Sequence, residues 1–227
     1  MEFKQIPFGK YLSIFVSGPQ RSGTRYTAQT IADSLKDYRC IQTGTTQHDE
    51  FDWPYYGEKD FPWKIHPAHR EIRLASRGIS IHPNKDNKVI QCPNVSHKLH
   101  KLKDAKDFVI WMVRNEEDVN ASEERINWLQ SSHDPPRNRF EEEEKPKYLD
   151  MFPEYEEKIK SFKRNYTMKT WMWNNVQKPL MKVDYLELPF ETLRQTDGYL
   201  PKEKRKGFTK DQIRWKNWDE DIPKIVG

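Results

Sequence analysis

The sequence predicts an α/β fold in which a central, mostly parallel sheet carries helices on both faces. Patterns typical of strands and of helices alternate along the chain, as they do in parallel sheets. Asp107–Val113 is an almost continuous apolar run, the pattern of a central strand that is buried on both sides. Tyr11–Ser17 is a second short apolar run, and a glycine-bearing turn and a helical pattern follow it directly.

Each further element is predicted from its local pattern. The expected strands are Tyr11–Ser17, Tyr38–Thr43, Lys88–Cys92, Asp107–Val113 and Pro179–Tyr185. Helices are expected over 24–36, over 116–130, over 154–177 as one long helix, near Glu191, and in a short segment that carries Val95, Leu99 and Leu102. Residues 44–70 are expected to form a long loop, and 131–150 a charged, solvated excursion.

Size and composition limit the classes of protein to which the chain can belong. The 227 residues suit a single domain, 1–227, and the net charge of +4 points to a small anionic ligand more than to duplex nucleic acid. Cys40 and Cys92 lie in apolar runs, as expected of reduced thiols in the cytoplasm, and they have no metal-ligand spacing. We expect a cytoplasmic protein, because no signal peptide or membrane-spanning run is found.

The turn from Gly18 to Thr24 has the features of an anion-binding loop. A strand that enters a glycine-bearing turn and then a helix directs backbone N–H groups and the positive end of the helix dipole at one point. Ser22 and Thr24 add hydroxyl groups, and Arg21 and Arg25 add positive charge. The alternative is a plain strand-to-helix turn in which the hydroxyls cap the helix.

This loop departs from the nucleotide-binding pattern G-x-x-x-x-G-K-[ST]. Gly18 and Gly23 have the required spacing, but Thr24 stands at the lysine position and Arg25 at the position of the Mg²⁺-binding hydroxyl. These two differences weaken the case for an ordinary ATPase or kinase.

The loop does resemble that of sulfotransferases that use 3′-phosphoadenosine 5′-phosphosulfate (PAPS). Their 5′-phosphosulfate loop reads P-[KR]-S-G-T-T, and Gln20–Arg25 matches it at the basic residue, Arg21, and at Ser22, Gly23 and Thr24, with Arg25 in place of the second threonine. The resemblance implies a three-layer fold of the P-loop type and phosphosulfate binding by residues 20–25. A cation at Arg21 would stabilise charge on the leaving phosphate without a metal ion.

A second motif of this family follows in the expected order. The family binds the 3′-phosphate with an arginine at the end of a central strand and a serine eight positions later, in R-N-x-x-D-V-x-x-S. Here Arg114 follows the central strand and Ser122 stands eight positions later, with Asn115, Asp118 and Val119 also matching. Arg114 would lie at the carboxyl edge of the sheet, where open α/β folds bind ligands; the alternative is surface pairing with Glu116 or Glu117.

Three further stretches are similar to family elements. Residues 182–186 resemble the late strand of the family, which carries the signature Y-E-x-L. The R-K-G and W-K-N elements, which clasp the 3′-phosphate and cover the adenine, resemble Arg205-Lys206-Gly207 and Trp215-Lys216-Asn217. A basic stretch in a flexible tail would explain the latter equally well.

The general base is not where the cytosolic sulfotransferases have it. Their catalytic histidine ends the strand before the arginine strand, and this chain has Gln91-Cys92-Pro93 there. Other branches of the family use a glutamate, so we expect Glu50 or Asp49 to act as base, with His48 as the second choice and a solvated polar loop as the alternative. The other candidate histidines are His97 and His100, which are more often structural at such positions, and His66 and His69, which could contact an acceptor.

The sequence therefore favours a PAPS-dependent sulfotransferase that acts on a hydroxyl or amine and requires no metal ion. The aromatic segment 51–66 suits a sugar, a phenol or another small acceptor. Two alternatives remain at this stage: a nucleotide kinase or phosphotransferase with a degenerate loop, and a nucleotide-binding protein of the same fold without catalysis.

Overall fold

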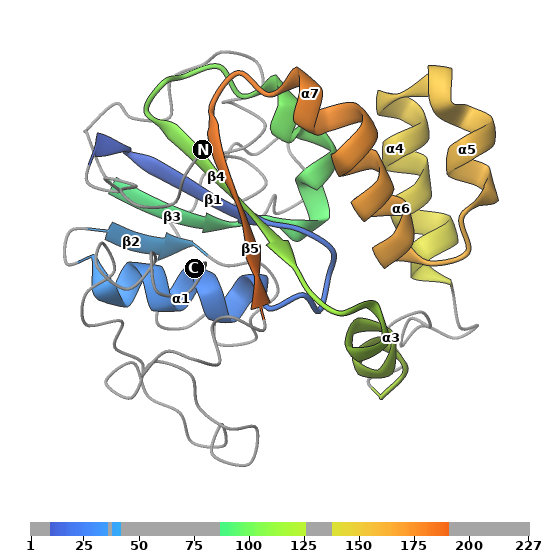
Figure 1. Cartoon of the computed structure of the whole chain (residues 1–227), viewed down its shortest axis with the longest axis horizontal. Helices are drawn as coiled ribbons and strands as arrows, with labels where there is room; N and C mark the ends of the chain where they lie inside the picture. The colour runs from blue at the N-terminus through green and yellow to red at the C-terminus, as the bar shows by residue number, and fades with distance from the viewer. Residues whose placement is uncertain (1–9, 36–37, 42–86, 126–137, 191–227) are drawn as a thin grey trace, which may run out of the picture.

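The computed structural model describes residues 10–35, 38–41, 87–125 and 138–190, and Figure 1 shows how they are arranged. Five strands form one all-parallel sheet in the order β2-β3-β1-β4-β5. The strands are β1 (Ser13–Ser17), β2 (Tyr38–Ile41), β3 (Asn87–Gln91), β4 (Asp107–Val113) and β5 (Asp184–Pro189). The α/β class and the parallel sheet predicted from the sequence are confirmed.

The chain adds strands first on one side of β1 and then on the other, so the order of the strands reverses at the centre of the sheet. From β1 the chain passes to β2 and β3 on one side, whereas β4 and β5 lie on the other. Val16 is in register with Gln91 of β3, and Ser17 with Trp111 of β4. The loops after β1 and β4 therefore leave the same edge at adjacent strands, and open parallel sheets bind ligands at such a point.

Both faces of the sheet are buried. Alternate residues of β1 point to opposite sides: Ile14 and Val16 belong to the core beneath α1 (Thr24–Ser34), and Phe15 belongs to the core on the other face. In Figure 1, α1 covers one face. The other core includes Leu99 of the 3₁₀ helix η4 (Pro93–Lys101) and Trp173, whose ring stacks on Trp111 of β4 with centroids 4.4 Å apart. The predicted short segment with Val95, Leu99 and Leu102 is thus helical over most of its length.

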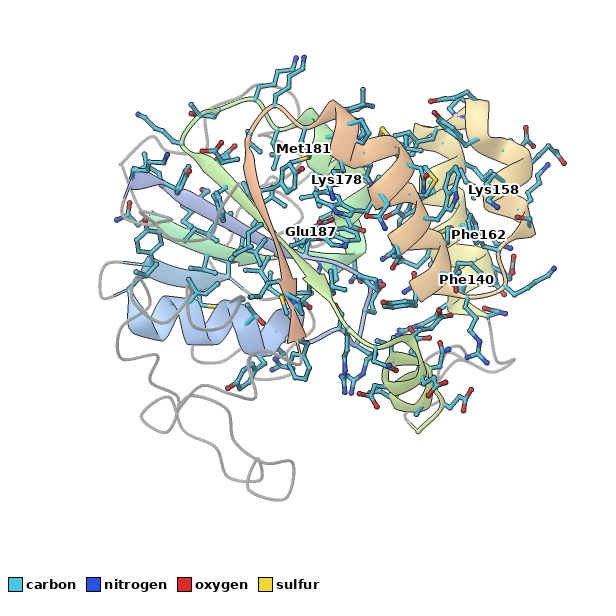
Figure 2. All side chains as sticks on the ribbon, viewed as in Figure 1. Phe140, Lys158, Phe162, Lys178, Met181 and Glu187 are labelled. Carbon is cyan, nitrogen blue, oxygen red and sulfur yellow. The ribbon has the colours of Figure 1, made fainter. Side chains whose placement is uncertain are left out.

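A group of helices beside the sheet has a core of its own. It comprises η5 (Phe140–Glu144), α4 (Lys145–Met151), η6 (Pro153–Tyr155), α5 (Glu156–Ser161), α6 (Asn165–Met172), η7 (Trp173–Gln177) and α7 (Lys178–Leu180). Figure 2 shows Phe140, Lys158 and Phe162 in this group. Within the predicted charged, solvated excursion over 131–150, residues 140–150 are helical and bury Phe140 and Tyr148, so the expectation of a solvated segment is wrong there. Glu141, Glu142 and Glu143 lie on the exposed side of η5, whereas Phe140 and Glu144 are buried, so the run of four glutamates suggested a segment that is solvated on all sides.

The predicted long helix over 154–177 is also wrong. The chain leaves the helical conformation at Phe162 and re-enters it at Asn165, so that α5 and α6 are separate helices, and α4 lies between them in Figure 1. The ring of Phe162 lies 5.9 Å from that of Trp171, because both belong to the core of the helix group. Aromatic residues on both sides of the break continue the helical spacing, which explains the error.

The last strand begins later than predicted. Residues 178–180 are helical as α7, and β5 pairs with β4 from Asp184, opposite Phe108, to Pro189, opposite Val113. Figure 2 shows Lys178, Met181 and Glu187 near this junction. The Nζ of Lys178 donates to the Oε2 of Glu187 at 2.8 Å, which joins α7 to β5.

The helix predicted over 116–130 is confirmed as α3 (Glu116–Arg125), and its predicted continuation lies outside the described residues. The Oδ1 of Asn115 accepts from the backbone N–H groups of Glu117 and Asp118 at 2.9 and 3.2 Å, which caps the helix. The predicted loop over 44–70 and the helix near Glu191 are outside the described ranges. Among the described helices, none has both the length and the apolar character needed to cross a membrane.

Candidate anion-binding site at the carboxyl edge of the sheet

The loop between β1 and α1 takes a shape that requires glycine twice. Gly18 has φ 139° and Gly23 has φ 93°, values that other residues rarely adopt. Space is also limited: a Cβ at Gly18 would lie 2.8 Å from the carbonyl oxygen of Met112, and a Cβ at Gly23 would lie 2.2 Å from the ring of Phe190. The loop is therefore wedged between the ends of β4 and β5.

Short hydrogen bonds hold the turn closed. The Oγ of Ser22 donates to the carbonyl of Pro19 at 2.6 Å, and the Oγ1 of Thr24 accepts from the Nε2 of Gln91 at 3.0 Å. The N–H of Thr27 donates to the carbonyl of Gly23 at 3.0 Å, so the N–H groups of the three preceding residues lie before the i→i−4 ladder of α1. The start of α1 thus has the amide arrangement that favours an anion.

Two arginines and a serine that are distant in the sequence meet at this edge. The Nε of Arg21 donates to the Oγ of Ser122 at 3.0 Å, and the Nη1 of Arg114 donates to the carbonyl of Arg21 at 2.9 Å. The guanidinium of Arg114 lies 4.7 Å from the ring centroid of Phe190, and its Nη2 is 4.0 Å from the carboxylate of Asp118. The sequence assigned Arg21 to one phosphate and Arg114 with Ser122 to another, and the structure brings all three together.

Hydrogen bonds from neighbouring residues fix the position of the backbone at Arg114. The hydroxyl of Tyr166 in α6 donates to the backbone carbonyl of Arg114, directly after β4. Asn115 caps α3, and this cap sets the direction of the helix that carries Ser122. Arg114 and Ser122 are consequently positioned by two elements that leave the same strand end.

The remaining loop residues have different surroundings. Arg25 lies on the exposed side of the first turn of α1. Gln20 is buried: its Nε2 donates to the Oδ1 of Asn94 at 2.8 Å, and its Oε1 accepts from the Nδ2 of Asn165 at 2.7 Å. The amide of Gln20 therefore links the loop to η4 and to α6.

A fully buried lysine, which the sequence analysis did not identify, contacts the loop through Gln20. The Nζ of Lys169 donates to the Oε1 of Gln20 at 2.6 Å and to the carbonyl of Pro93 at 2.9 Å, and it lies 2.6 Å from the Oε2 of Glu144. Asn165 and Lys169 are four residues apart in α6, on the side that also carries Met168 and Met172. The signal in the sequence that could have identified these two residues is their spacing of four positions within an apolar stripe of a helix.

Glu123 adds a buried carboxyl group next to Ser122. Its side chain is 0% exposed, and burial raises its pKa to about 7, although Asn165, Lys169, Arg164 and Arg21 act in the opposite direction. This carboxyl group can therefore change its charge near neutral pH, within the electrostatic influence of Arg21.

The two histidines predicted from the η4 segment pack against aromatic rings. Burial, together with the nearby cations of Lys98 and Lys169, lowers the pKa of His97 to about 3, and its ring packs against Tyr148 at 5.8 Å. The ring of His100 lies 5.0 Å from that of Phe152, and burial lowers its pKa as well. Both histidines are neutral packing residues at physiological pH.

Several predicted site residues lie outside the described part of the chain. These are the candidate bases His48, Asp49 and Glu50, the acceptor-side histidines His66 and His69, and the C-terminal residues Arg205, Lys206 and Gly207.

Both cysteines lie within the described ranges, and both are buried and not joined in a disulfide. Burial raises the pKa of Cys92 to about 12, so this thiol is protonated and unreactive at neutral pH. No group of three or more metal-ligating side chains forms among the residues that the structure describes.

Comparison with models of protein families, with curated proteins and with solved structures finds no match for this chain. Arg21, Arg114 and Ser122, with the two sequence motifs that contain them, are therefore the features that indicate a function.

Proposed function

We propose that the chain is a PAPS-dependent sulfotransferase that transfers the sulfuryl group to a hydroxyl or amine of a small acceptor, such as a sugar or a phenol. The convergence of Arg21, Arg114 and Ser122 at the carboxyl edge of β1 and β4 carries this proposal. Two cations, one hydroxyl and the start of a helix form a site for a ligand with more than one anionic group.

The nucleotide would span this cluster. The 5′-phosphosulfate would lie over the loop of residues 18–24, where the first N–H groups of α1 point, and the 3′-phosphate would lie at Arg114 and Ser122. Arg21 lies between the two regions, because its side chain reaches Ser122 while its backbone belongs to the loop.

The chemical step would be an in-line displacement at sulfur. The acceptor oxygen or nitrogen forms a bond to sulfur and loses its proton to a base, while the bond from sulfur to the bridging oxygen breaks. Both electrons of that bond go to the phosphate of 3′,5′-adenosine bisphosphate. Arg21 would stabilise the charge on the departing phosphate, and the loop would keep the reacting atoms aligned. The proposed bases are Glu50 and Asp49, then His48.

Titration calorimetry with 3′,5′-adenosine bisphosphate, compared with ATP and Mg²⁺, tests the proposal. We expect the bisphosphate to bind without Mg²⁺ and more tightly than ATP. Mg²⁺-dependent ATP binding with no response to the bisphosphate would reject the proposal and favour a phosphotransferase. If the bisphosphate binds, an assay with PAPS and a panel of sugars, phenols and amines tests transfer, and binding without transfer to any acceptor would favour a protein without catalysis.

A further inference from the structure

The loop that carries Arg21 is supported by a charged side chain from α6. Lys169 lies in α6, 149 residues after Gln20, and its Nζ joins the amide of Gln20 to the carboxylate of Glu144. The same Nζ donates to the carbonyl of Pro93, at the carboxyl end of β3. One ammonium group thus connects the loop, η4 and the helix pair η5–α4.

A buried lysine at this position requires an explanation. Its side chain is 0% exposed, and burial lowers its pKa, an effect that the carboxylate of Glu144 opposes. Buried ion pairs contribute little net stability compared with apolar residues that fill the same space. The three acceptors around Nζ therefore indicate a role in fixing their positions.

The backbone of Arg21 has a conformation that needs support from its surroundings. Arg21 has φ 66°, a left-handed conformation that is unfavourable for a residue with a Cβ and persists only where the surroundings enforce it. On one side, the adjacent Gln20 is held by Asn94, Asn165 and Lys169. On the other, the carbonyl of Arg21 is held by Arg114.

We propose that Lys169 is a positioning residue of the anion site, which acts through Gln20 to keep Arg21 in the conformation that directs its guanidinium at Ser122. Lys169 does not contact the ligand in this scheme, since its Nζ is turned toward Gln20, Pro93 and Glu144. The choice of 3′,5′-adenosine bisphosphate as the ligand in the test rests on the proposed function. The effect of Lys169 on the conformation of the loop does not depend on that function.

The test compares two double variants that each remove a lysine–glutamate pair in which the lysine is buried. Lys169→Met/Glu144→Gln removes both charges of the pair that supports the loop. It also removes the ion-pair partner of Lys147, whose Nζ lies 2.7 Å from the Oε1 of Glu144 and which is partly exposed to water. Lys145→Met/Glu141→Gln is the matched control: Lys145 is 7% exposed and lies 2.7 Å from Glu141, and its other hydrogen bond goes to the carbonyl of Lys160, in the helix group. Unfolding midpoints measure the structural cost of each change.

Two readouts report on the loop. Hydrogen exchange of the backbone amides of residues 18–25 is measured in the ligand-free proteins, and calorimetry measures affinity for 3′,5′-adenosine bisphosphate. We expect faster loop exchange and affinity weakened by about 10- to 100-fold in Lys169→Met/Glu144→Gln alone, because a misplaced binding group loses much of its contribution. Unchanged loop exchange in that variant, or an equal increase in the control, would overturn the proposal.

A single variant covers the case in which the first double variant does not fold. Gln20→Leu cuts the same connection from the side of the loop and leaves Lys169 beside Glu144. It should also accelerate exchange over residues 18–25, and loop exchange equal to that of the wild type would overturn the proposal. If the wild-type protein does not bind the bisphosphate, the proposed function fails, and loop exchange still decides the role of Lys169.

Discussion

Arg114 holds the backbone of Arg21: its Nη1 donates to the carbonyl of Arg21 at 2.9 Å. The two residues lie 93 positions apart, and they meet because β1 and β4 are neighbours in a parallel sheet and end at the same edge. One arginine thus contributes its charge to the site and also fixes the loop that presents the other arginine.

Arg114→Ala should weaken the binding of 3′,5′-adenosine bisphosphate by about 2–4 kcal/mol, because both the charge and the support of the loop are lost. Titration calorimetry measures the change. Arg139→Ala is the control, since Arg139 is a partly exposed arginine whose Nε lies 3.8 Å from Glu143, in the helix group. Equal affinities of wild type and Arg114→Ala would exclude Arg114 from the site.

Ser122→Ala should cost about 1–2 kcal/mol of bisphosphate affinity with little change in the unfolding midpoint. The Oγ of Ser122 accepts from the Nε of Arg21, so its removal frees the guanidinium to turn away and also removes a donor to the ligand. Ser161→Ala serves as control, because the exposed Ser161 donates to the carbonyl of Lys158, in α5. An effect of the same size in both variants would argue against a specific role for Ser122.

Gly23→Ala should destabilise the protein by about 1–3 kcal/mol, because alanine is strained at φ 93° and its Cβ would overlap the ring of Phe190. Urea unfolding measures the loss. In a Phe190→Ala background the overlap disappears and the backbone strain remains, so the cost of Gly23→Ala should become smaller there. A cost that is the same in both backgrounds would show that the ring moves away freely.

The sheet could be predicted from the sequence. β4 was predicted with its observed bounds, because a strand buried on both faces leaves a continuous apolar run in the sequence. The sequence also predicted that Arg114 lies at the carboxyl edge of the sheet. The adjacency of β1 and β4, which brings Arg114 to the loop, comes from the structure.

The helix group and the residues below the loop could not be predicted in the same way. Phe162 and Trp171 continue one apolar pattern across a break in the helix, so the pattern alone could not reveal the break. Lys169 has the appearance of a surface residue in the sequence, and its role depends on Gln20 and Glu144, which are distant along the chain. Contacts of this kind are set by tertiary packing, which a single sequence does not display.

The buried carboxyl group of Glu123 should make stability depend on pH. Burial raises its pKa to about 7 in the folded protein, against 4.5 for the ordinary group, so the folded state holds a proton that the unfolded state has released between these values. Stability from this group is fully present below about pH 4.5 and is lost as the pH rises to about 7. Glu123→Gln should therefore gain about 1–2 kcal/mol relative to wild type at pH 8 and little at pH 4.5.

Urea unfolding of wild type and Glu123→Gln across this range measures the difference. Glu124→Gln is the matched control, because Glu124 is 62% exposed and makes a surface ion pair with Arg164 at 3.3 Å. A stability difference between wild type and Glu123→Gln that stays constant from pH 4.5 to 8 would contradict the raised pKa. A difference that grows with pH would mean that charging Glu123 opposes folding beside the anion site, where the cations of Arg21 and Lys169 offset only part of the cost of burial.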